Sequence, residues 1–97
     1  MSKVRVIVSF KFNQQINNDT LARLYAFARA AQSNPGCEQF ELLEDLEHPE
    51  HFSFVELWKS ADAVEQHTQT PYFRDFVIFL AANVSNLTVR RMQQLPY

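Results

Sequence analysis

One histidine is placed where it can transfer a proton. His67 is the only histidine predicted to lie inside an element, since His48 falls in the loop of residues 45–50 and His51 is beside it, at the first position of a strand. It follows Val64 by three residues, which puts both side chains on the buried side of a helix. An unperturbed imidazole titrates near pH ~6.5, so His67 can act as a general base near neutral pH. The alternative is a structural histidine that bonds a backbone carbonyl at the helix end.

A carboxyl group and an indole share one strand face with Phe54. Trp58 can form the wall of a site for a flat aromatic substrate and donate one hydrogen bond, or it can be a core residue beneath the helices. Glu56 is unusual, because a carboxylate on a face of Phe and Trp is costly unless it is paired. We prefer an orienting or structural role for it over a catalytic one. Its candidate partners are Arg74, Arg90, Arg91 and the second ring nitrogen of His67.

Aromatic residues early in the last predicted helix complete the candidate site. Tyr72 lies in the first turn, where it can bond a substrate or cover the mouth of a pocket. Phe73 and Phe76 are typical core residues that would also make the pocket apolar. The spacing of His48 and His51 is not that of a recognised metal site, so we expect no metal.

The pattern of apolar residues predicts the elements that must position these side chains. Period-two alternation indicates strands over residues 4–12, 37–44 and 51–59, and a fourth is predicted over residues 87–92. A helix begins at Leu21 after a cap at Asn18 or Asp19, and it ends in a turn at residues 33–36, where Gly36 supplies a positive φ. A second helix, residues 61–69, is capped by Ser60, and Thr70-Pro71 starts another. The buried stripe of the first helix is expected to be Leu21, Leu24, Tyr25, Ala28 and Ala31.

The order β-α-β-β-α-β predicts a ferredoxin-like α+β fold, with one four-stranded antiparallel sheet and helices on one face. The second helical segment is broken at Thr70-Pro71. Both faces of the strands carry apolar residues, so Ile7, Leu43, Val55 and Leu57 would be exposed in a monomer. We therefore expect a homodimer in which a second sheet covers this face.

Composition excludes several classes of protein. The 97 residues form one domain, with 46% hydrophobic and 21% charged residues, which argues against disorder. A single glycine excludes a glycine-rich phosphate loop, and a net charge of -2 gives no footprint for nucleic acid. The longest apolar stretch is too short to span a membrane, so we expect a cytoplasmic protein.

The central part of the chain resembles the antibiotic biosynthesis monooxygenase family. The resemblance lies in Pro35-Gly36-Cys37, Phe40-Glu41-Leu42-Leu43, Phe54-x-Glu56-x-Trp58 and Ala63-x-x-x-His67-x-x-x-Pro71-x-Phe73, and it covers about residues 4–89. It implies a dimeric α+β barrel that oxidises a small quinol, phenol or related compound with O2, without metal or flavin. It also raises the weight of His67 as the catalytic residue, with Trp58, Glu56, Tyr72, Phe73 and Phe76 binding the substrate.

Other functions on the same scaffold stay open. The haem-degrading relatives carry a haem-binding histidine ten residues after the position of His67, where this chain has Val77. They also tend to carry an asparagine in the first strand, and residues 3–12 contain none. The alternatives are a non-catalytic dimer that binds a small hydrophobic ligand and an isomerase. Uptake of O2 during turnover separates the monooxygenase from both.

Overall fold

The computed structural model describes residues 2–97. Four strands and three helices follow one another along the chain, in agreement with the predicted order. They are β1 (Val4–Phe12), α1 (Asn18–Gln32), β2 (Cys37–Glu44), β3 (His51–Trp58), α2 (Ala61–Thr68), α3 (Pro71–Asn83) and β4 (Val84–Met92). None of these helices is long and apolar enough to cross a membrane.

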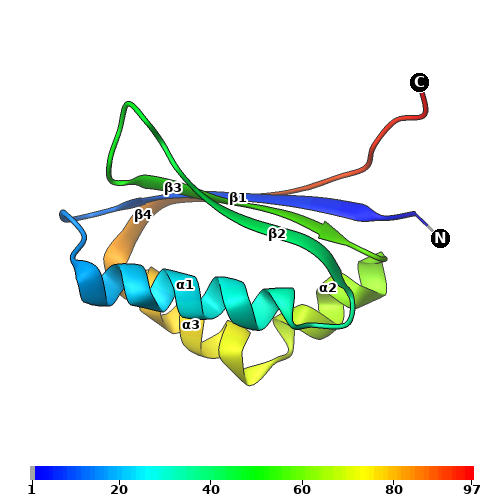
Figure 1. Ribbon diagram of the computed structural model, residues 1–97, viewed down its shortest axis with the longest axis horizontal. Helices are drawn as coiled ribbons and strands as arrows, with labels where there is room; N and C mark the ends of the chain where they lie inside the picture. Colours follow the sequence, from blue (N-terminus) through cyan, green and yellow to red (C-terminus); the bar gives the residue numbers. More distant parts are fainter. Residues whose placement is uncertain (1) are drawn as a thin grey trace.

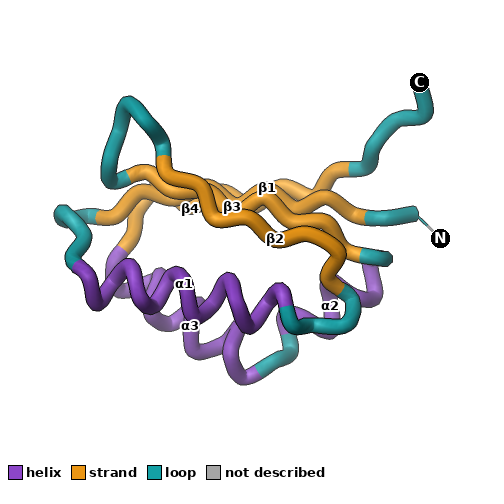
Figure 2. Tube along the Cα trace, in the orientation of Figure 1, coloured by secondary structure: helices purple, strands orange, loops and turns teal. Residues whose placement is uncertain are grey.

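The strands form one antiparallel sheet in the order β2-β3-β1-β4. All three helices lie on one side of it, as Figures 1 and 2 show, and this confirms the ferredoxin-like α+β fold. Figure 1 also shows the loop between β2 and β3 rising on the side away from the helices. The molecule thus has two layers, and its apolar core lies between them.

Polar side chains at the helix starts satisfy the free N–H groups there. Ser60 and Thr70 cap α2 and α3 by accepting bonds from the N–H groups of Ala63 and Phe73, as predicted for Ser60. The cap of α1 is Asn17, whose side chain accepts from the N–H of Thr20. The prediction of Asn18 or Asp19 was wrong, because the helix begins one turn earlier than the first apolar residue of its stripe.

The buried face of α1 differs from the predicted stripe in one position. Leu24, Ala28 and Ala31 are buried, but Tyr25 is 45% exposed. Phe27 takes its place with 7% exposure, and its ring stacks on that of Phe76 at 4.0 Å between centroids. Tyr25 and Phe27 both have helical spacing to the other buried residues, so the periodicity alone did not show which of the two is buried.

Gly36 does not have the positive φ that was expected of it, since no glycine of residues 2–97 does. Glycine is required here for another reason, because a Cβ built at this position would lie 2.7 Å from the Cβ of Ala63. The turn that leads into β2 therefore packs directly against the start of α2.

The last strand is longer than predicted. It begins at Val84, directly after α3, and not at Leu87. The register between β1 and β4 shifts between Ser9 and Lys11, and Asn86 has a φ of 56° at that point. This irregularity breaks the simple alternation that the sequence reading relied on.

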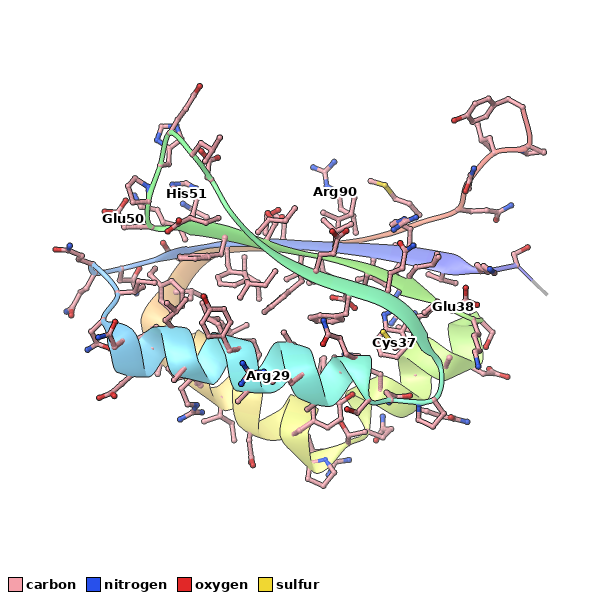
Figure 3. All side chains as sticks on the ribbon, in the orientation of Figure 1. Arg29, Cys37, Glu38, Glu50, His51 and Arg90 are labelled. Carbon is pink, nitrogen blue, oxygen red and sulfur yellow. The ribbon has the colours of Figure 1, made fainter. Side chains whose placement is uncertain are left out.

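The sheet face that points away from the helices is bare in this chain. Ile7, Val55 and Leu57 are half-buried there, and Leu43 and Met92 are exposed. Figure 3 shows His51 and Arg90 projecting from the same face. The face is therefore mixed, with an apolar centre across β1 and β3 and polar groups around it.

Candidate functional site

A cavity of about 120 Å³ lies between the sheet and the helices. Most of its lining is apolar, and Glu56 and His67 are the two buried ionisable groups in it. Sheet residues supply one wall and α1, α2 and α3 supply the other. The lining residues are Val6, Val8, Phe27, Phe54, Glu56, Val64, His67, Thr68, Phe73, Phe76, Val77, Leu80, Leu87, Val89 and Arg91.

Alternation along β3 turns Phe54, Glu56 and Trp58 toward the helices. Trp58 is completely buried, and its Nε1–H donates to Oε1 of Glu56 at 2.8 Å. None of the four partners predicted for Glu56 was right: Arg91 pairs with Glu65, Arg74 donates to Gln69, and Arg90 lies beside Ile7 on the other face of the sheet. The hydrogen bond of His67 goes from Nδ1 to Tyr72, and no hydrogen bond joins His67 to Glu56 within residues 2–97. Trp58 thus lies behind the cavity and holds Glu56, which lines it.

Burial changes the acidity of Glu56. The side chain is 4% exposed, and loss of hydration raises its pKa from 4.5 to about 7, although the bond from Trp58 works in the opposite direction. Glu56 is therefore poised to gain or lose a proton near neutral pH.

His67 lies on the buried face of α2 with 3% exposure. Its Nδ1 is 2.6 Å from the hydroxyl oxygen of Tyr72, and its ring lies 4.3 Å from that of Trp58. Burial lowers its pKa from 6.5 to about 4, so the imidazole is neutral at pH 7. The helix break predicted at Thr70-Pro71 is what brings Tyr72 back against His67.

Six predicted site residues divide into two groups. Glu56, His67, Phe73 and Phe76 line the cavity. Trp58 and Tyr72 do not, but each is hydrogen-bonded to a polar residue that does. The structure therefore brings all six together, with the indole and the phenol forming a supporting layer.

The sequence reading missed two residues of the site. Phe27 lines the cavity from α1. Asn34, which was interpreted only as part of a turn, donates from Nδ2 to the Tyr72 hydroxyl at 3.3 Å, and its Oδ1 accepts from the N–H of Gly36 at 2.9 Å. An asparagine before Pro-Gly signals a turn, and nothing in that signal indicates a partner in α3.

The mouth of the cavity lies between α3 and β4. Val77, Leu87 and Val89 line the cavity and are exposed. Beside them Arg91 also lines the cavity and forms an ion pair with Glu65 at 3.0 Å. A small apolar molecule can therefore enter along the edge of β4.

The size of the cavity limits what it can hold. An engineered apolar cavity of about 150 Å³ binds benzene, so a volume of about 120 Å³ corresponds to a single ring. No group of three or more His, Cys, Asp or Glu side chains in residues 2–97 is arranged to hold a metal ion.

A two-layer fold with an apolar cavity between sheet and helices, lined by one carboxyl group and one imidazole, places this protein among the ferredoxin-like α+β domains with a buried site. Residues 3–77 match the family described as antibiotic biosynthesis monooxygenase. The chain belongs to that family.

One curated protein is similar to this chain in sequence. An uncharacterized protein of Synechocystis sp., sll1783, is 32% identical over 69 residues, which are 71% of this chain and 47% of that protein. The chain thus spans about half the length of this curated relative.

Solved structures share the fold over almost the whole chain. One described as an antibiotic biosynthesis monooxygenase has a TM-score of 0.89 at 24% identity and covers 96% of this chain and 99% of its own. PA3566 of Pseudomonas aeruginosa has a TM-score of 0.89 at 21% identity, with 99% and 97% covered. At these identities the likeness establishes the fold alone.

Proposed function

We propose that this protein is a cofactor-independent monooxygenase that oxidises a small quinol, phenol or related electron-rich compound with O2. The observation that carries the proposal is the apolar cavity between sheet and helices with Glu56 and His67 in its lining. Membership of the monooxygenase family supports it.

The chemistry needs an ionised substrate. O2 is a triplet and reacts slowly with neutral closed-shell molecules, whereas a phenolate gives up an electron far more readily. For a quinol the balance is one quinol and one O2 to one hydroxyquinone and one water. The protein's task is to bind the ring, receive the hydroxyl proton and stabilise the anion, and we place His67 in direct contact with that hydroxyl. An apolar cavity also suits O2, which is itself apolar.

The working unit in this proposal is a homodimer. The apolar centre of the bare sheet face, formed by Ile7, Val55 and Leu57, supports it. Covering this face with the same face of a second copy would bury more than about 1,000 Å² in total, as a specific interface requires. Light scattering at micromolar concentration should give the mass of two chains.

A second candidate function is non-catalytic binding, or isomerisation, of a small hydrophobic ligand. It is favoured by the apolar lining, which is sufficient to bind such a ligand without any reaction. Ligand binding that is not accompanied by O2 uptake would support this candidate over the monooxygenase.

The test is O2 consumption with a panel of one-ring quinols and phenols, followed with an oxygen electrode. We expect His67→Ala to lower turnover by ~10²-fold or more, the usual scale for loss of a proton-transfer group or of a donor to a developing anion, and to leave the dimer intact. His48→Ala is the matched control, since His48 lies in the exposed loop after β2. Equal turnover by His67→Ala and wild type would show that His67 is structural.

A further inference from the structure

A chain of hydrogen bonds favours one particular nitrogen of His67 as the one that carries its proton. The N–H of Gly36 donates to Oδ1 of Asn34 at 2.9 Å, so the amide nitrogen of Asn34 must point the other way. That nitrogen donates to the hydroxyl oxygen of Tyr72 at 3.3 Å. Because the Tyr72 oxygen already accepts from Asn34, its hydroxyl proton is available to donate to Nδ1 of His67, 2.6 Å away.

A neutral imidazole that accepts at Nδ1 carries its proton on Nε2. No hydrogen bond within residues 2–97 uses this Nε2, and no fully buried side-chain nitrogen or oxygen in that part of the chain lacks a partner. Nε2 therefore keeps contact with the cavity that His67 lines. His67 presents an N–H donor to a bound molecule, and the nitrogen that could accept a proton is occupied by Tyr72.

A hydrogen bond also fixes the role of each carboxyl oxygen of Glu56. Trp58 has only a donor, and it bonds Oε1, which leaves Oε2 as the atom that gains or loses the proton. Oε2 has no hydrogen-bond partner within residues 2–97, and no fully buried side-chain oxygen there lacks one. Oε2 is therefore not fully buried, and it keeps contact with the cavity that Glu56 lines. The cavity thus contains one fixed donor and one free carboxyl oxygen.

We propose that Glu56 is the base that takes the substrate hydroxyl proton, and that His67 binds the resulting oxygen anion through its Nε2–H. This inference rests on the proposed function and assigns roles within the same site. The substrate O–H bond breaks, its proton goes to Oε2, and the electron pair stays on the substrate oxygen. Tyr72 and Asn34 are positioning residues, because they act through His67.

The acidities of the two groups agree with these roles. The pKa of Glu56 is about 7, so the ionised base is present at neutral pH, while the pKa of His67 is about 4 and keeps it neutral. The other titratable groups near Glu56 are the Cys37 thiol, the Tyr72 hydroxyl and Arg91, whose charge is paired with Glu65. Burial raises the pKa of both Cys37 and Tyr72, so neither competes for the proton at pH 7.

The tautomer can be tested without substrate. In protein labelled with 15N-histidine, His67 at pH 7 should show a protonated Nε2 and an unprotonated Nδ1, and its signals are assigned among the three histidines with His67→Gln. Tyr72→Phe removes the donor and should produce a mixture of tautomers. A protonated Nδ1 in the wild type would overturn the assignment of His67 as the donor.

Glu56 can be followed through its neighbour. Trp58 is the only tryptophan and is bonded to Glu56, so its fluorescence should titrate with a midpoint near pH 7 in the wild type and lose that titration in Glu56→Gln. A fluorescence titration that is unchanged in Glu56→Gln would contradict the assignment of the ionising group.

Kinetics then separate this inference from the proposed function. With an active quinol, Glu56→Gln should lower kcat by ~10²-fold and abolish the rise of kcat near pH 7, whereas His67→Gln should lower kcat and keep that rise. Asp62→Asn, which changes an exposed carboxyl in the first turn of α2, is the control. If Glu56→Gln keeps the full rate, the base assignment is wrong and the monooxygenase proposal stands. If the wild type consumes no O2 with any quinol while the tautomer and the titration are as expected, the monooxygenase proposal is wrong. The protonation states assigned to His67 and Glu56 then still hold.

Discussion

The stability of this protein should depend on pH through two buried groups that act in opposite directions. Burial in one cavity raises the pKa of Glu56 from 4.5 to about 7 and lowers that of His67 from 6.5 to about 4. Removing each ionisable group separately, by Glu56→Gln and His67→Gln, should reveal an effect that is hidden in the wild type.

The sign follows from which state holds the proton. Between pH 4.5 and about 7 the folded chain keeps a proton on Glu56 that the unfolded chain has released, so this group reduces stability as the pH rises. Between about pH 4 and 6.5 the unfolded chain holds a proton on His67 that the folded chain does not, so this group increases stability as the pH rises. At 1.36 kcal/mol for each pH unit, each effect amounts to about 3 kcal/mol, and the two nearly cancel where their ranges overlap.

The assay is urea unfolding from pH 4 to 8, followed by circular dichroism at one fixed protein concentration, because the stability of the proposed dimer would depend on concentration. Relative to the wild type, Glu56→Gln should become more stable by about 3 kcal/mol as the pH rises, and His67→Gln should become less stable by about the same amount. Subtracting the wild-type curve removes the contribution of all other groups. Two flat difference curves, or two curves with the same sign, would refute the reasoning.

Three other substitutions test the packing and the assembly. Trp58→Ala removes a fully buried indole and should lower the free energy of unfolding by about 3–5 kcal/mol, so a loss below about 1 kcal/mol would contradict its place in the core. Gly36→Ala puts a Cβ 2.7 Å from that of Ala63 and should lower Tm, and adding Ala63→Gly should restore most of the loss, whereas no restoration would mean that the strain lies elsewhere. Leu57→Glu should give a monomer in light scattering, and a persistent dimer would place the interface on another surface.

The fold was predictable because its strands alternate clearly and their order admits few topologies. Alternation along residues 51–58 placed Phe54, Glu56 and Trp58 on the helix side, as found. The break at Thr70-Pro71 was also predictable, since proline at the first helical position and a capping threonine are local signals. These features depend on neighbours in the sequence, which a pattern can reveal.

The details of the site depend on contacts between distant residues. Asn34 reaches Tyr72 across 38 positions, and no local pattern connects them. The partner of Glu56 was within two positions, but the prediction considered three arginines and a histidine and did not consider the neighbouring indole. A neutral indole N–H was sufficient, because burial raises the pKa and lowers the cost of keeping the group.

The burial that costs stability is also what makes the proposed reaction feasible. A phenol in water has a pKa of about 10, so a carboxylate with the ordinary pKa of 4.5 is too weak a base by about 7 kcal/mol. With its pKa at about 7, Glu56 reduces that difference to about 4 kcal/mol. The apolar walls also raise the pKa of the bound phenol, so a donor aimed at the phenolic oxygen is needed to stabilise the anion. One such donor typically contributes about 2.7–4 kcal/mol, and this is the role that we propose for the Nε2–H of His67, a residue that lines the cavity. A histidine protonated on Nδ1 would lack this donor, and for that reason the hydrogen bond from Tyr72 matters as much as the histidine.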